Sequence, residues 1–444
     1  MSVVGRKFLH ASDIHIGFPL GSLGETGHIS EDDMKTVIEE MRGAFDNLIE
    51  TAISENVMFV VLAGDIYDGA QAQDALQGHF QRGLERLNDH DIKVFIIHGN
   101  HDPLERQSKR RKPFPPNTKV FRPKDPEEVL AFEDGDEKIY VSGVSFETTS
   151  ESNNLAIRFK DLPNEHARWR VGVLHTSLAG SSDHDPDAPC SVDDLRNAPV
   201  AYWALGHIHL RSDNNSLDRG RWWAYSGNLQ GRNFKASECH PKGALLVTAT
   251  SDGYARPEFV ACDTVRFQTL SIPVDDVSEY EDLYGLIAEE ARSAADSTDG
   301  RRLVCRVVLT GRHADYKKIR NACNAEADNS ASLLAGIIDS YGSDLGSTMV
   351  TDIQCDVLPT FDMNSLRQGD SMLAVALRRL DEMSDQEVVD QCAELLDSTP
   401  ARVLFPQTNN SESEASLNVE LVASIRKQVE LALAETIIEE GAVK

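Results

Sequence analysis

The stretch ALGHIH, residues 204–209, ends an apolar run with a glycine and two histidines that are separated by one residue. Residues two apart in an extended chain point to the same side, so His207 and His209 can serve one site. One such pair can arise by chance. Its interpretation depends on whether other segments supply partners at an equivalent place.

Four further apolar runs end in polar side chains. FLHASDIH ends in Asp13 and His15, VVLAGDIYD in Asp65 and Asp68, VFIIHGNHD in Asn100, His101 and Asp102, and VGVLH in His175. In open α/β sheets, ligands bind beyond the carboxyl ends of the strands. Carboxylates, an amide and imidazoles at five strand ends therefore predict one shared site. The set exceeds what one ion needs, and it suits two divalent ions about 3.5–4 Å apart that share a carboxylate.

The periodicity of the whole chain predicts three regions. Short apolar runs alternate with amphipathic segments over residues 1–262, which indicates an α/β domain with a largely buried sheet and with helices over 31–55 and 71–89. A second, smaller α/β domain is expected over 265–360, with one helix over 278–295 and another over 314–340. Residues 364–444 are expected to form a helical tail, with a linker near 409–416 and an amphipathic helix over 417–440.

Composition sets limits on the class of protein. The chain has 444 residues, too many for one ordinary core, and 26% of them are charged, which is typical of a globular protein. No apolar run reaches the roughly 18 residues needed to cross a bilayer, and the N-terminus lacks a signal-peptide pattern, so a cytoplasmic location is expected. The seven cysteines are scattered, and we expect reduced thiols.

The net charge of −28 argues against nucleic acid as a partner, but the charge is unevenly distributed. Residues 106–124 hold eight basic residues and no acidic ones, directly after GNHD. We expect DNA contacts from this loop and from arginines near GHIH, because cationic side chains pair with phosphate. The candidates are Lys109, Arg110, Arg111, Arg211 and Arg232. The alternative is a solvated loop that happens to be basic.

The order DIH, GDIYD, GNHD, LHTS and GHIH resembles the signature of the calcineurin-like metallophosphoesterases. FLHASDIHIG, YWALGHIHLR and YSGNLQGRNF are similar to bacterial SbcD-type DNA repair exonucleases, especially their YhaO-like branch. The resemblance is sharp over about residues 1–250, architectural over 265–360 and weak over the tail. It implies an α/β sandwich of two mixed sheets flanked by helices, with a small α/β capping domain and a helical tail.

The resemblance also implies a role for each motif residue. One metal ion would be held by Asp13, His15 and His209, the other by Asn100, His175 and His207, with Asp65 bridging them. Mixed imidazole and carboxylate ligands suit manganese, iron or zinc better than magnesium. The resemblance favours two Mn²⁺ ions.

Other residues of the motifs would act around the metals. His101 would contact the scissile phosphate or protonate the leaving oxygen, and Asp102 would orient His101. Asp68 would lie behind the ligands and not bind a metal itself. Ser226 stands where relatives often have proline.

The activity implied by the resemblance is a metal-dependent DNA repair exonuclease with single-strand endonuclease activity. Its partner would be an SbcC-like coiled-coil ATPase, docked by the helix over 417–440, and the protein could form a homodimer. Two alternatives stay open. One is a phosphodiesterase or phosphatase on small nucleotides, which shares all five motifs. The other is a non-catalytic assembly subunit, which would have no need of the ligand array.

Overall fold

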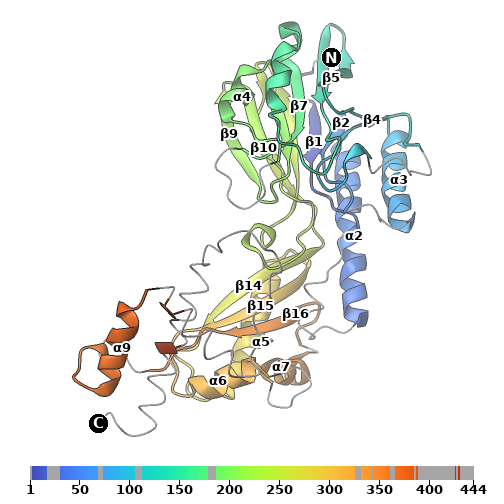
Figure 1. The fold of residues 1–444 in the computed structure, drawn as a ribbon. Helices are drawn as coiled ribbons and strands as arrows, with labels where there is room; N and C mark the ends of the chain where they lie inside the picture. Colours follow the sequence, from blue (N-terminus) through green and yellow to red (C-terminus); the bar gives the residue numbers. More distant parts are fainter. Residues whose placement is uncertain are drawn as a thin grey trace. The chain divides into compact units, whose positions relative to one another are not determined.

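The computed structural model describes residues 3–17, 31–68, 74–105, 113–178, 187–325, 332–342, 344–360, 366–384, 387–388, 426 and 429–430 (Figure 1). The chain forms two compact units. The first comprises Met1–Gly311 and Asp315–Val357, and the second Arg312–Ala314 and Leu358–Lys444. Among the described residues, no helix has the length and apolar character that a membrane span requires.

A seven-stranded mixed sheet begins the first unit. Its order is β12 (Gly253–Tyr254), β11 (Gly243–Thr250), β1 (Lys7–Ala11), β2 (Phe59–Ala63), β3 (Lys93–Ile97) and β4 (Thr118–Val120), with β13 (Glu258–Ala261) also beside β11. Strands β1 to β4 run parallel, whereas β11 is antiparallel to β1. The carboxyl ends of β1, β2 and β3 therefore lie at one edge of the sheet.

The second sheet has six strands and is also mixed. Its order is β5 (Glu127–Asp134), β6 (Glu137–Gly143), β7 (Arg170–His175), β8 (Tyr202–Gly206), β10 (Arg221–Tyr225) and β9 (Ser212–Asp218). The four central strands are parallel, and the edge strands β5 and β9 are antiparallel to their neighbours.

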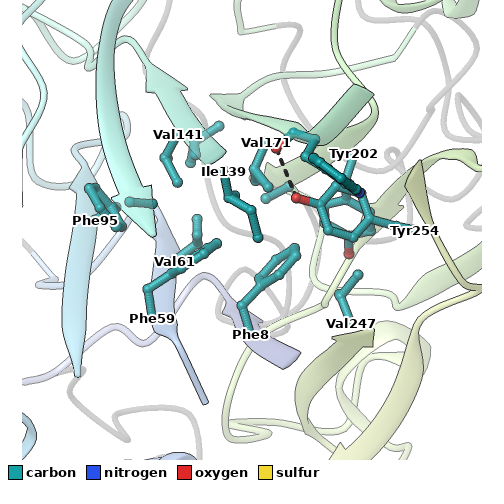
Figure 2. Packing of buried hydrophobic residues seen from close by; sticks show 14 of the residues in the cluster. Phe8, Phe59, Val61, Phe95, Ile139, Val141, Val171, Tyr202, Val247 and Tyr254 are labelled. Atoms are coloured by element: carbon teal, nitrogen blue, oxygen red, sulfur yellow. Dashed lines mark hydrogen bonds between the residues drawn. The ribbon is translucent and has the colours of Figure 1, made fainter. Parts of the chain in front are cut away.

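The two sheets pack face to face through one apolar core. Figure 2 shows Phe8 and Phe59 of the first sheet in the same cluster as Val171 and Tyr202 of the second. The rings of Phe8 and Tyr202 meet edge to face, with centroids 5.4 Å apart. This arrangement confirms the expected sandwich of two mixed sheets.

Helices cover the outer face of the first sheet. In β2, Phe59, Val61 and Ala63 enter the core between the sheets, whereas Val60 and Leu62 pack beneath the helices. These are α2 (Glu31–Ser54) and α3 (Asp74–Asp89), close to the expected helical ranges. A strand buried on both faces has no polar alternation, which explains why FVVLA is apolar throughout.

A three-stranded parallel sheet follows in the same unit. Its strands are β14 (Val265–Pro273), β15 (Arg302–Thr310) and β16 (Met349–Cys355), and its helices are α5 (Asp282–Asp296), α6 (Tyr316–Cys323) and α7 (Leu333–Tyr341). The prediction of one continuous helix over 314–340 is wrong. Helix α6 ends at Cys323, and α7 begins at Leu333, where the Ser332 hydroxyl accepts a hydrogen bond from the Ala335 amide. The boundaries of the capping domain stay a prediction.

The second unit contains α9 (Met372–Glu382), which the Ser371 side chain caps by accepting from the Ala374 amide. Near it, the Arg426 guanidinium donates to the Leu380 carbonyl at 2.8 Å. The expected linker near 409–416 lies outside the described residues. So does the helix expected over 417–440, except for Arg426, Val429 and Glu430.

Candidate metal centre

The motif residues stand at the carboxyl ends of five parallel strands. In the first sheet, Asp13 follows β1, Asp65 follows β2 and Asn100 follows β3. In the second sheet, His175 ends β7 and His207 follows β8. Because the sheets face each other, these ends meet: Nε2 of His175 lies 3.0 Å from Oδ1 of Asn100 and 3.5 Å from Oδ2 of Asp65.

One group of possible ligand atoms comes from Asp13, His15 and His209, all buried and all within 4.8 Å of one another. The Nε2 atoms of His15 and His209 are 3.2 Å apart, and Nε2 of His209 is 3.8 Å from Oδ1 of Asp13. Two imidazole nitrogens at that distance can share a proton or bind one cation. The carboxylate beside them favours a cation.

Asp65 joins this group to its neighbours. It belongs to a group with Asp13 and His175 and to another with His15 and His101. The backbone amide of His207 donates to both carboxylate oxygens of Asp13 at 3.1 Å, and the rings of His207 and His175 meet edge to face with centroids 5.1 Å apart. All seven predicted ligands therefore gather at one place, with Asp65 common to two of the groups.

The backbone at the centre is unusual. Asp13, His15, Asp65 and His207 have positive φ angles of 51°, 49°, 52° and 98°. A positive φ at a non-glycine residue strains the backbone and lowers the stability of the fold by about 1–3 kcal/mol per residue. Strain of this kind is common at functional sites. Gly64 also has a positive φ, of 95°, and a Cβ atom there would collide with the imidazole of His175.

Hydrogen bonds at the outer ring nitrogens orient two of the imidazoles. Nδ1 of His175 is 3.0 Å from the Ala63 carbonyl oxygen, and Nδ1 of His209 is 2.8 Å from Oε1 of Glu238. With the proton on Nδ1, the lone pair on Nε2 faces the cluster, as metal-binding histidines require. Buried carboxylates, inward-facing imidazole nitrogens and an amide oxygen fit a pair of divalent cations.

Glu238 has no counterpart among the expected site residues. It is 2% exposed, and its Oε2 accepts from the Asn228 side chain at 2.6 Å. Burial alone would raise its pKa, but the hydrogen bond from His209 and the charges of His209 and Arg232 lower the pKa to about 2. No motif marks a lone glutamate in KASECH, so only the folded chain reveals it.

His101 is more exposed than the other histidines of the centre, with 43% of its side chain accessible. Its Nδ1 lies 2.8 Å from Oδ1 of Asp68, and this hydrogen bond raises the pKa of His101 despite the opposing effect of partial burial. The backbone amide of His101 donates to Oδ1 of Asp65 at 3.0 Å. His101 therefore stands at the accessible side of the cluster.

The contact expected from Asp102 to His101 is made by Asp68. The carboxylate of Asp102 accepts from the amides of Ile66 and Gly99 at 3.0 Å, and it lies 3.1 Å from Nδ1 of His98. Asp102 therefore holds together the loops that follow β2 and β3. The physical reason is the turn after β3, which directs the Asp102 side chain toward these amides.

The five residues expected to contact DNA have different surroundings in the structure. Lys109, Arg110 and Arg111 lie outside the described residues. Arg211 pairs with Asp213 at 3.2 Å, and its guanidinium lies over the Phe259 ring. Arg232 is only 7% exposed, and its Nη2 lies 3.1 Å from Nδ1 of His209, so it belongs to the surroundings of the centre and not to an exposed basic surface.

The chain matches the calcineurin-like phosphoesterase family over residues 6–211 and the middle domain of the metallophosphoesterase YhaO over 267–340. It is 30% identical over 304 residues to the uncharacterized metallophosphoesterase YhaO of Bacillus subtilis, covering 68% of this chain and 71% of that protein.

More distant relatives have names that refer to DNA repair and nuclease activity. The DNA double-strand break repair protein Mre11 of Sulfolobus acidocaldarius is 25% identical over 257 residues, covering 55% of this chain and 61% of that protein. One component of the nuclease SbcCD of Staphylococcus epidermidis is 25% identical over 254 residues, covering 50% and 61%. The chain therefore spans less than two thirds of either protein.

Proposed function

This chain belongs to the calcineurin-like metallophosphoesterase family, and from that premise we propose that it is a metal-dependent DNA repair exonuclease that also cleaves single strands internally. The observation that carries the proposal is the gathering of seven motif residues, Asp65 among them, at one place. Such a cluster suits hydrolysis of a phosphate ester. The names of the more distant relatives favour DNA as the substrate.

We assign Asp13, His15 and His209 to one cation, and Asn100, His175 and His207 to the other, with Asp65 between them. When bound, the two ions stabilise charge on the phosphate oxygens and lower the pKa of the attacking water. The mixed ligand set favours manganese, iron or zinc, and we propose two Mn²⁺ ions.

The protein's own groups complete the reaction. His101 holds a proton in its hydrogen bond with Asp68, and it lies at the exposed side of the cluster. There it can donate a proton or hydrogen bond to the departing sugar oxygen, a contribution of about 10²–10⁴-fold in rate. Asp68 favours the protonated form of the ring and orients it, while Glu238 orients His209.

The partners form part of the same proposal. We propose that an SbcC-like ATPase with a coiled coil binds the helix expected over 417–440, that the chain can form a homodimer, and that it acts in the cytoplasm. Deleting 409–444 should abolish co-purification with such an ATPase while leaving the metal content intact. Retained co-purification would exclude this segment as the docking site.

One assay tests the proposed activity. Purified full-length protein with Mn²⁺ should degrade end-labelled duplex DNA and should cleave single-stranded circles. Hydrolysis of bis-p-nitrophenyl phosphate without any DNA cleavage would favour a phosphodiesterase on small nucleotides instead. Binding of metals without hydrolysis of any ester would favour a non-catalytic subunit.

A further inference from the structure

A cavity of about 400 Å³ adjoins the candidate metal centre. Its wall includes His15, one of the proposed ligands, and Arg232, which contacts the ligand His209. The rest of the wall comes mainly from the loop after β1, from α2 and from α3. A molecule whose phosphate lies at the metal centre would therefore have this cavity next to its phosphate.

The lining combines an apolar wall with cationic groups. Ile38 and Met41 contribute apolar surface. The basic residues Lys35, Arg42 and Arg232 also line the cavity, against a single acidic one, Glu39. Lys35 pairs with Asp32 at 3.2 Å and Arg232 lies 3.5 Å from Glu238, so part of this charge is neutralised. The lining still suits an anionic ligand with an apolar part.

The size and composition match a site for a small organic group. Ligand sites usually enclose about 300–1,000 Å³, are lined mainly by apolar side chains, and carry a few polar groups that orient the ligand. A flat base in the cavity would bury apolar area against Ile38 and Met41.

We propose that this cavity is a nucleobase subsite, which receives the base of the nucleotide whose phosphate lies at the metal centre. The inference rests on the proposed function, because it names the substrate of that same centre as a nucleotide ester. It explains how a cluster able to attack any accessible phosphate ester would select nucleotides: the base contributes binding that a plain phosphate lacks.

Calorimetry on the Mn²⁺-loaded full chain tests the subsite with four ligands. They are inorganic phosphate, 2-deoxyribose 5-phosphate, phenyl phosphate and deoxyadenosine 5′-monophosphate. We expect the nucleotide to bind about tenfold or more tightly than the other three, since burying a base removes a large apolar area from water. Equal affinities for the nucleotide and the sugar phosphate would overturn the proposal. Phenyl phosphate binding as tightly as the nucleotide would overturn it too, in favour of a general aromatic pocket.

Substitutions at Ile38 locate the effect. Ile38→Trp fills the cavity and should raise the Kd of the nucleotide about tenfold, to that of 2-deoxyribose 5-phosphate. The Kd of inorganic phosphate should stay unchanged, which would show that the metal centre is intact. Ile38→Ala, which adds no bulk, should raise the Kd of the nucleotide by about threefold. A matched control is Ile157→Trp, because Ile157 is 46% exposed and does not line the cavity. Unchanged nucleotide affinity in both Ile38 variants would contradict the assignment.

The subsite and the proposed nuclease can fail separately. DNA cleavage together with equal affinities for nucleotide and phosphate would support the proposed nuclease activity and exclude the nucleobase subsite. A clear preference for the nucleotide without cleavage of DNA would support a nucleotide-binding site and exclude the proposed nuclease activity.

Discussion

Oε1 of Glu238 lies 2.8 Å from Nδ1 of His209, and both side chains are buried. The carboxylate orients an imidazole whose opposite nitrogen, Nε2, faces His15 and Asp13. Outer contacts of this kind typically change metal affinity by about 10–100-fold.

Glu238→Ala should therefore weaken Mn²⁺ binding by about 10–100-fold, as measured by calorimetry on metal-free protein. Glu238→Gln should retain part of the affinity, because its amide oxygen can still accept from His209. The exposed Glu258 offers a control, since Glu258→Gln leaves the centre untouched. Wild-type affinity in Glu238→Ala would show that His209 needs no such support.

Asp65→Asn should reduce the bound metal from about two ions per chain to one or none, because the proposed bridge is lost. Elemental analysis after gel filtration measures this directly. DNA cleavage should fall with the metal content. Asp136→Asn, at an exposed position, should retain both ions. Two tightly bound ions in Asp65→Asn would exclude Asp65 as the bridge.

His101→Ala should lower kcat by about 10²–10⁴-fold while leaving the metal content at its wild-type level. The reason is that His101 is proposed to act on the leaving oxygen and not to bind a metal. Asp68→Asn should lower kcat less, since the imidazole remains in place without its carboxylate. A loss of metal in His101→Ala that matched the loss of rate would make His101 a ligand instead.

Gly64→Ala should lower the melting temperature of the metal-free protein by about 5 °C or more, because its φ of 95° and the collision with His175 both oppose a side chain. Gly135 is a matched control. It also has a positive φ, of 63°, but nothing lies within 4 Å of an added Cβ. Gly135→Ala should therefore lower the melting temperature by only about 2–3 °C. Equal shifts would show that crowding by His175 is unimportant.

Cys355 should be the most reactive thiol among the described cysteines. A hydrogen bond with Cys323 lowers the pKa of Cys355, whereas burial raises the pKa of Cys190 to about 11. The thiolate is the nucleophile, so alkylation of Cys355 should be faster than that of Cys190 at neutral pH and should level off at a lower pH. Peptide mapping after brief iodoacetamide treatment at several pH values measures this. Faster labelling of Cys190 at pH 7 would contradict the order.

Much of the fold follows from local patterns in the chain. The apolar run FVVLA specifies a strand buried on both faces, and α2 lies close to its expected range. The strand ends that carry Asp13 and Asp65 point to a common edge, because parallel strands of one sheet end on the same side. These features depend on residues near one another in the chain, where periodicity reports burial directly. His175 ends a strand of the second sheet, and it joins Asp13 and Asp65 because the two sheets face each other.

Contacts across long sequence separations do not follow from such patterns. The partner of His101 is Asp68 and not its neighbour Asp102, and the support of His209 comes from Glu238, 29 residues away. Sequence patterns indicate which face a residue occupies, but they do not show which distant side chain will share that place. The end of α6 at Cys323 and the start of α7 at Leu333 also differ from the single helix expected over 314–340.

The α/β class and the polar strand ends that carry Asp13, Asp65 and His175 can be read from the amino-acid chain, because periodicity and motif spacing are local properties. The sandwich of two mixed sheets is implied by the resemblance to the family. Three features become visible only after folding: which carboxylate orients which imidazole, the burial of Arg232, and the cavity that opens beside His15. These depend on how two sheets and α2 pack against one another, and packing is a property of surfaces assembled from distant segments.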